Sequence, residues 1–78
     1  MSQQEWLDVF GDNLLSILEE EGISQKELSR LTGLSESTIS RYINKLQMPN
    51  MRAIINISYA LNWSFEDMLN YGSMLEDI

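Results

Sequence analysis

The chain has 78 residues, of which 44% are hydrophobic, and it carries a formal net charge of −7. This length corresponds to one small domain, and we expect residues 1–78 to form it. Cysteine and histidine are both absent, which excludes disulfides, removes the two commonest ligands of transition metals, and predicts a protein with no bound metal and no cofactor.

The first predicted helix begins at Ser2, which forms a capping box with Glu5. Apolar residues then recur on one helical face and are expected to enter the core. Gly11 lies within this stripe and leaves open an interruption near Asp12, and Gly22 ends the helix. The stripe consists of Trp6, Leu7, Phe10, Leu14, Ile17 and Leu18.

Three consecutive acids, Glu19, Glu20 and Glu21, lie at the C-terminal end of this helix. The helix dipole disfavours anions there, so the sequence offers no stabilising role for them. Two interpretations remain open: a solvated surface, or an acidic patch that repels DNA or binds a basic partner.

Two short helices joined by a sharp turn are predicted within residues 24–44. Ser24 and Glu27 form a capping box for the first helix, and Ser35 caps the second. Gly33 between them can adopt the positive φ that the turn needs, and small Ser29 allows a close approach. Apolar side chains are expected to hold the pair together: Leu28, Leu34, Ile39 and Tyr42.

The second helix of this pair leaves only polar side chains on its outward face. All of them can donate or accept hydrogen bonds, and polar residues on such a helix are used to read base edges in the major groove of DNA. They are Glu36, Ser37, Ser40, Arg41 and Asn44.

A fourth helix follows the loop 45–50, with Pro49 placed before an Asn50 cap and Asn62 at the end. Its apolar positions are Ile54, Ile57, Ala60 and Leu61. Arg52 lies near the start of this helix, where backbone N–H groups also favour an anion, so we expect it to contact a DNA phosphate.

Ser64 and Asp67 are expected to cap a short fifth helix that stops at Gly72, with Trp63 packed against the core. The last two helices carry more apolar surface than one small bundle can bury, and such surface usually marks an interface. We therefore predict a homodimerisation segment over residues 51–78, with recognition helices roughly 34 Å apart and a near-palindromic DNA site. The candidate residues are Met51, Ile55, Tyr59, Met68, Tyr71, Met74 and Leu75.

The net acidity opposes DNA binding, but the charges are unevenly distributed. Residues 1–23 and 53–78 contain six and four acids and no base, whereas residues 24–52 contain all five bases and two acids. A basic segment therefore coincides with the helix pair.

The sequence resembles the lambda-repressor-like, or Cro/repressor, helix-turn-helix domains of bacterial and phage regulators. The resemblance extends from about Ile23 to Tyr71. The sequence departs from the family pattern at Thr32, where the family is usually apolar. It also departs at Leu18 and Ile43, where the family often has a buried ion pair. Replacing both partners of such a pair by apolar residues is often tolerated. The residues that carry the resemblance are Gln25, Leu28, Ser29, Gly33, Ile39, Asn44, residues 60–64, Met68 and Leu69.

The resemblance implies an all-α, compact five-helix bundle in which helices 2 and 3 form the helix-turn-helix. It implies that Glu36, Ser37, Ser40 and Arg41 face base edges and that Gln25, Thr38 and Asn44 contact phosphates. The basic segment adds Lys26 and Lys45 to the expected phosphate contacts.

We accordingly predict a sequence-specific transcriptional regulator, of repressor type and prokaryotic or phage origin, that reads double-stranded DNA with helix 36–43. The alternative is a protein-binding module of the same fold, an anti-regulator or antitoxin-like partner that uses its acidic and apolar surfaces. No enzyme is expected, because His and Cys are absent and the sequence offers neither paired carboxylates nor a Ser/Lys arrangement in a plausible cleft. Ser35, Ser37 and Ser40 have simpler roles as caps or groove-facing hydroxyls. No apolar run matches a membrane span or signal peptide, which predicts a cytoplasmic protein.

Overall fold

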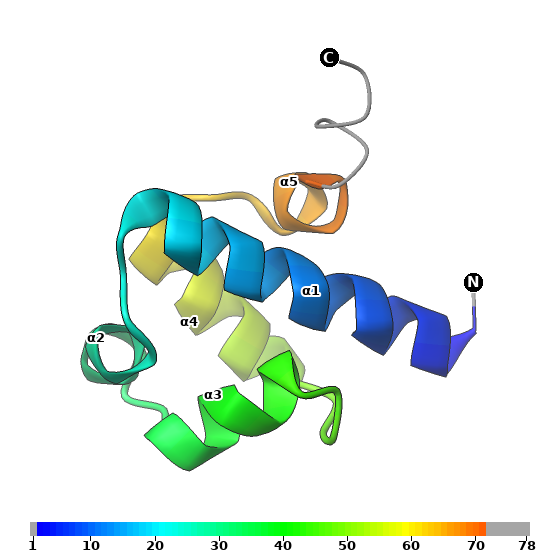
Figure 1. Cartoon of the computed structure of the whole chain (residues 1–78), viewed down its shortest axis with the longest axis horizontal. Helices are drawn as coiled ribbons and strands as arrows, with labels where there is room; N and C mark the ends of the chain where they lie inside the picture. Colours follow the sequence, from blue (N-terminus) through cyan, green and yellow to red (C-terminus); the bar gives the residue numbers. More distant parts are fainter. Residues whose placement is uncertain (1, 72–78) are drawn as a thin grey trace.

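The computed structural model describes residues 2–71, which form a bundle of five helices (Figure 1). Within these residues no strand occurs, and the predicted all-α fold is confirmed. No described helix is both long and apolar enough to cross a membrane. The helices are α1 (Gln3–Glu21), α2 (Gln25–Thr32), α3 (Glu36–Ile43), α4 (Met51–Leu61) and α5 (Phe65–Leu69).

Helix α1 is the central element of the bundle, with α3 on one side and α5 on the other (Figure 1). Helices α2 and α3 contact each other, and α4 contacts both α2 and α5. The pair formed by α2 and α3 therefore lies on the opposite side of α1 from α5.

Helix α1 begins at the predicted capping box: Ser2 Oγ accepts from the Glu5 N–H at 3.1 Å, and Glu5 Oε1 accepts from the Ser2 N–H at 3.4 Å. The helix runs without the interruption near Gly11 that the sequence left open. Gly11 is buried, and its missing side chain leaves room for α3. The glycine thus serves packing between helices and does not break α1.

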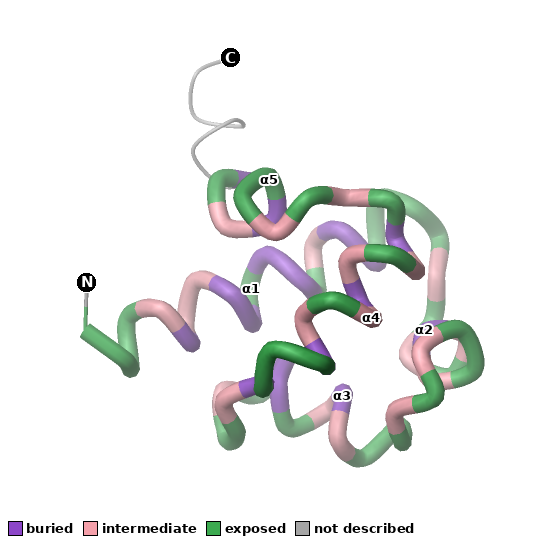
Figure 2. The backbone as a smooth tube through the Cα atoms, turned by 180° about the vertical axis from the view of Figure 1, so that it is seen from behind, coloured by how far each residue is buried: buried purple, intermediate pink, exposed green. Residues whose placement is uncertain are grey.

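The core is formed by one apolar face from each helix. Figure 2 shows the buried stretches of α1, α3 and α4 on the sides that face one another. Aromatic rings extend the core: Trp6 stacks on Phe10 with 5.2 Å between centroids, and Phe10 meets the edge of Tyr42 at 6.5 Å. The largest fully buried side chains are Phe10, Leu14, Ile17, Leu28, Ile39, Ile57 and Met68.

Helix α5 is fixed to α1 by a buried asparagine. Asn13 Nδ2 donates to the carbonyl oxygens of Met68 at 2.8 Å and Leu69 at 3.1 Å. These carbonyls lie at the end of a short helix, where they have no partner within the helix itself. Asn13 therefore satisfies them and holds α5 against the middle of α1.

The acidic cluster at the end of α1 also holds this region in place. Tyr71 Oη donates to Glu20 at 2.7 Å, and Trp63 Nε1 donates to Glu21 at 3.2 Å. The hydrogen bond to Glu20, followed by burial, raises the pKa of Tyr71. Two of the three glutamates thus have a structural role that the sequence did not reveal.

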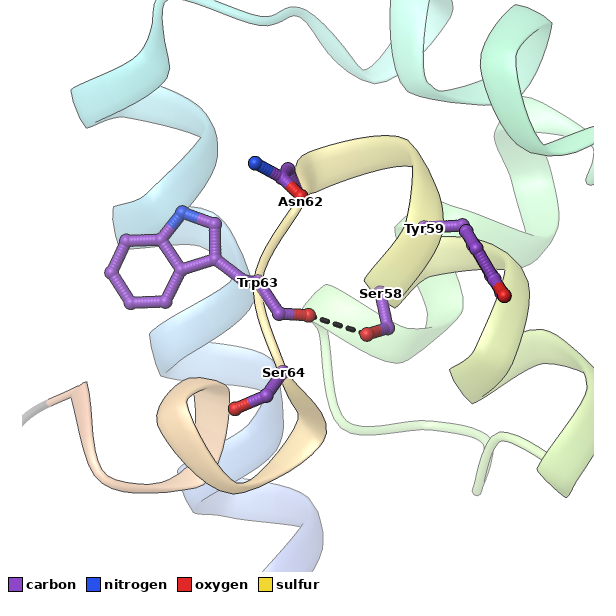
Figure 3. Close-up of a pocket in the computed structure, with 5 residues that line it drawn as sticks. All are labelled: Ser58, Tyr59, Asn62, Trp63 and Ser64. Carbon is purple, nitrogen blue, oxygen red and sulfur yellow. Dashed lines mark hydrogen bonds between the residues drawn. The ribbon is translucent and has the colours of Figure 1, made fainter.

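Two aromatic residues, one in α4 and one in the turn between α4 and α5, lie on opposite sides of the chain (Figure 3). Trp63 extends toward α1, where its ring meets the edge of Tyr71 at 5.5 Å, as expected for a core-packing residue. Tyr59 projects away from it. Asn62 ends α4 with φ +56°, and Ser58 Oγ donates to the carbonyl oxygen of Trp63, which closes the turn.

The expected second apolar face is present on α4 but does not extend to α5. Met51, Ile55 and Tyr59 are 70%, 47% and 85% exposed. Met68 and Tyr71, in contrast, are buried: Asn13 donates to the Met68 carbonyl oxygen, and Tyr71 Oη donates to Glu20. Gly72, Met74 and Leu75 lie outside the described residues. Among the described residues the exposed surface is therefore smaller than predicted, and we call Met51, Ile55 and Tyr59 the α4 apolar surface.

Candidate nucleic-acid interface

The first helix of the pair, α2, begins at Ser24, whose Oγ accepts from the Glu27 N–H at 3.0 Å. The other half of the predicted capping box is not formed. Glu27 instead accepts from Arg30 Nε at 3.0 Å, and this hydrogen bond lowers the pKa of the Glu27 carboxyl. One hydroxyl cap together with an exposed ion pair therefore stabilises this end of α2.

The turn between α2 and α3 centres on Gly33, which adopts φ +76° as predicted. Ser29 Oγ donates to the Leu34 carbonyl oxygen at 2.6 Å. Thr32 Oγ1 donates to the Leu28 carbonyl oxygen at 2.8 Å and accepts from the Leu34 N–H at 3.2 Å. Thr32, the residue that departs from the family pattern, thus helps to close the turn.

The inward side of α3 is fixed by apolar packing. Ile39, Tyr42 and Ile43 are buried, and Leu18 joins the same core cluster. The apolar substitution for the family's ion pair is therefore accommodated inside the core. Because α3 also lies against Gly11 of α1, its rotation about its own axis is determined.

The outward side of α3 carries the side chains that the sequence assigned to base contacts. Glu36, Ser37 and Arg41 are exposed, and Ser40 is half-buried. Arg41 Nη2 donates to Ser37 Oγ at 3.3 Å, and its Nη1 donates to Gln47 Oε1 at 3.1 Å. We call Glu36, Ser37, Ser40, Arg41 and Asn44 the reading face.

The start and the end of α3 are held by side-chain hydrogen bonds. Ser35 Oγ accepts from the Thr38 N–H at 3.1 Å and donates to Thr38 Oγ1 at 2.8 Å. Asn44, which is exposed, donates from Nδ2 to Ser40 Oγ at 3.1 Å. Thr38 therefore supports the N-cap, and Asn44 extends the polar surface by one residue beyond the helix.

Three expected phosphate contacts lie at helix starts. Gln25 is the first residue of α2 and is half-buried, whereas Lys26 beside it is exposed. Arg52 is the second residue of α4 and is exposed. Backbone N–H groups near a helix N-terminus attract anions, so these positions suit a phosphate.

Lys45 differs from the other expected phosphate contacts because it already has a partner. Its Nζ lies 2.6 Å from Asp12 Oδ1, and that hydrogen bond raises the pKa of Lys45. Lys45 also adopts φ +63° in the turn that follows α3. The residue thus links the loop after α3 to α1.

Sequence reasoning missed two residues of this region. Gln47 was assigned only to a loop, and no local pattern indicates that its amide oxygen reaches Arg41. Gly11 was noticed but interpreted as a possible break in α1. The apolar stripe did indicate its role, because a glycine at a core-facing position indicates that another element approaches the helix closely.

No group of three or more potential metal-ligating side chains comes together in residues 2–71. The pocket in Figure 3 is lined by Ser58, Tyr59, Asn62, Trp63 and Ser64, which include no charged group.

Comparisons with known proteins agree with this geometry. Residues 13–72 match the family described as the Cro/C1-type HTH DNA-binding domain, a DNA-binding rather than an enzymatic family. The match confirms the resemblance inferred from the sequence. No match was found among curated proteins.

Two solved structures share the fold. One is the restriction-modification controller protein C.AhdI from Aeromonas hydrophila, with a TM-score of 0.76, 24% identity, and coverage of 80% of this chain and 94% of that one. The other is an HTH_3 family transcriptional regulator from Vibrio cholerae, with a TM-score of 0.83 and 17% identity. That alignment covers 91% of this chain but only 39% of the longer Vibrio protein.

Proposed function

The chain belongs to the Cro/C1-type HTH DNA-binding domain family, and we propose that it is a sequence-specific transcriptional regulator that reads the major groove of double-stranded DNA with α3. The observation that carries this proposal is the division of α3 into two sides. Ile39, Tyr42 and Ile43 anchor it in the core, while the reading face stays accessible.

Arg41 is the main base-reading residue of the proposal. Its guanidinium group is exposed, and a guanidinium can donate two hydrogen bonds to guanine O6 and N7. Glu36, at the start of α3, can accept from a cytosine amine, and Ser37 and Ser40 can donate to either base edge.

Phosphate contacts then orient α3 in the groove. Lys26 and Arg52 are exposed and carry charge, and Gln25, Thr38 and Asn44 offer further polar groups. Lys45 would need to share its ammonium between Asp12 and a phosphate. With few free cations, each domain binds weakly, so we expect tight binding to require two domains.

The α4 apolar surface supplies the contact between those two domains. Its groove is lined almost entirely by apolar side chains: Met51, Ile54, Ile55, Ser58, Tyr59 and Phe65. In a two-fold dimer the same patch meets itself, and the two α3 helices would enter successive major grooves roughly 34 Å apart on one side of a near-palindromic operator. Binding across a promoter would repress transcription, the outcome we propose.

The alternative is a module of the same fold that binds only protein through its acidic and apolar surfaces. Its acidic part is less favoured because Glu20 and Glu21 are already hydrogen-bonded to Tyr71 and Trp63. Salt dependence distinguishes the two functions. We expect duplex binding that weakens steeply as salt rises, because phosphate contacts release counterions. Failure to retain any duplex, even at low ionic strength, would favour the alternative.

A further inference from the structure

We propose that Gln47, in the loop after α3, is a positioning residue that sets the base preference of Arg41. This inference rests on the proposed function and adds a residue outside the helix to the determinants of specificity. Gln47 is exposed and lies six residues beyond Arg41, yet its Oε1 accepts from Arg41 Nη1 at 3.1 Å.

The guanidinium of Arg41 is held between two acceptors. Ser37 Oγ, one turn earlier on α3, accepts from Nη2 at 3.3 Å, and Gln47 Oε1 accepts from Nη1. Each terminal nitrogen carries two N–H bonds, so each keeps one for another acceptor. Two terminal N–H bonds, one on each nitrogen, therefore remain for guanine O6 and N7 while the two acceptors restrain the guanidinium group.

The loop that carries Gln47 is itself anchored. The Leu46 N–H donates to the Arg41 carbonyl oxygen at 2.8 Å, and the Lys45 N–H donates to that of Tyr42 at 3.1 Å. Lys45 Nζ contacts Asp12 of α1. Arg41 is part of α3, and the loop that carries Gln47 is bonded to the end of α3. Gln47 therefore occupies a defined place relative to Arg41.

A fixed arginine binds better than a free one. An unrestrained arginine loses rotamer freedom when it contacts a base, and a side chain already held in place loses less. A guanidinium with a defined direction also matches one base pair better than its competitors. Gln47 should therefore affect discrimination at a single position of the DNA site, through Arg41.

A double-mutant cycle tests this role. Gln47→Met keeps the length of the side chain but removes the acceptor, and it should weaken binding to the preferred duplex by roughly threefold to tenfold. The loss should fall on the same base pair that Arg41→Ala relaxes. In the Arg41→Ala background, Gln47→Met should have no further effect.

Gln47→Glu serves as the matched control because it keeps an acceptor at the same place. It should retain the parent's preference at that base pair, even where its added negative charge lowers affinity for all duplexes equally. Both variants change an exposed side chain, and unaltered thermal melting would confirm that the fold is unchanged.

Three results would overturn the inference. Gln47→Met could leave the preference unaltered, or cause the same loss with and without Arg41, which would mean that Gln47 contacts DNA directly. Arg41→Ala could retain the parent's preference, which would remove the residue that Gln47 is said to position. In all three cases the proposed function would still hold if the parent protein binds one DNA sequence selectively. A parent protein that selects no duplex would refute both the proposed function and the role of Gln47.

Discussion

Gly11 of α1 lies directly against the carbonyl oxygen of Tyr42 in α3: a Cβ atom at position 11 would be 2.8 Å from that oxygen. Such a distance is too short for a carbon atom, and the neighbour is backbone that cannot rotate away. The position of the recognition helix relative to α1 therefore depends on the absence of a side chain at residue 11.

Replacing Gly11 by alanine should destabilise the protein, although the same change usually favours a helix. In a helix, alanine is about 1 kcal/mol more favourable than glycine. Overpacking against α3, however, costs about 1–3 kcal/mol in the free energy of unfolding. We expect a net loss of up to about 2 kcal/mol in the free energy of unfolding, measured by urea denaturation. Ser16→Ala in the same helix is the control and should be neutral or slightly stabilising, whereas a stabilised Gly11→Ala protein would contradict the packing described.

Asn13→Ala should release α5 from α1. The substitution leaves the Met68 and Leu69 carbonyl oxygens without their donor, which should cost about 1–3 kcal/mol in the free energy of unfolding. Asn56→Ala is the comparison, because the Asn56 amide reaches only the Thr32 carbonyl oxygen at 3.5 Å. Equal losses for the two variants would show that the contact of Asn13 with α5 has no special weight.

Arg41→Ala and Arg52→Ala remove the same charge but should change DNA binding differently. Arg41→Ala should cost about 1–3 kcal/mol on the preferred duplex and relax the preference at one base pair. Arg52→Ala should weaken binding to all duplexes alike and reduce the salt slope by about one. Fluorescence anisotropy with a set of single-base variants measures both effects, and identical profiles for the two proteins would refute the division between base and phosphate contacts.

Ile55→Glu or Tyr59→Glu should dissociate the proposed dimer. A carboxylate buried in an apolar contact costs about 2 kcal/mol or more, which corresponds to roughly a thirtyfold weaker association. Sedimentation analysis should show monomers, and binding to a full site should fall toward that of a half-site. Leu15→Glu, at an exposed leucine on α1, is the control and should leave the dimer intact. Dimers that persist in both α4 variants would exclude the α4 apolar surface as the contact.

Stability should decrease at high pH because of Tyr71. Its hydrogen bond to Glu20 requires the protonated phenol, and the pKa of Tyr71 is raised by that bond and by burial. The contribution is present below the ordinary tyrosine pKa of about 10 and is lost as pH rises through the higher folded value. Burial also raises the pKa of Tyr42, so part of the alkaline loss should remain in Tyr71→Phe.

Tyr71→Phe should therefore show a shallower decline of unfolding midpoint between roughly pH 9 and 12. Thermal melts of both proteins across that range make the comparison. If the two curves decline in parallel, the Tyr71 phenol does not contribute in the way its contact indicates.

Much of this fold is encoded locally and was therefore predictable. Ser2, Ser24, Ser35, Asn50 and Ser64 each cap the helix they were expected to cap. A cap is recognisable because the side chain bonds to backbone only three residues away. The buried side of α3 was likewise predictable from the spacing of Ile39, Tyr42 and Ile43.

The errors concern contacts that no pattern within a single helix encodes. Met68 and Tyr71 looked like parts of an exposed face, but Asn13 and Glu20, more than fifty residues earlier, hold them inside. The contact of Gln47 with Arg41 depends on the loop after α3, which is held by backbone hydrogen bonds to Arg41 and Tyr42 and by the contact of Lys45 with Asp12. No periodicity within a segment reports such contacts. The assignment of individual residues to bases and phosphates remains a prediction.

The most direct test of the account is selection of bound duplexes from a random pool by the whole chain, with its oligomeric state measured alongside. We expect enrichment of one near-palindromic motif, with half-sites about one helical turn apart, bound by a dimer. The motif selected by the Arg41→Ala variant should match that of the parent protein except at one base pair of each half-site, where no base should be preferred. A pool that stays as diverse as the input would contradict the claim that α3 reads DNA sequence.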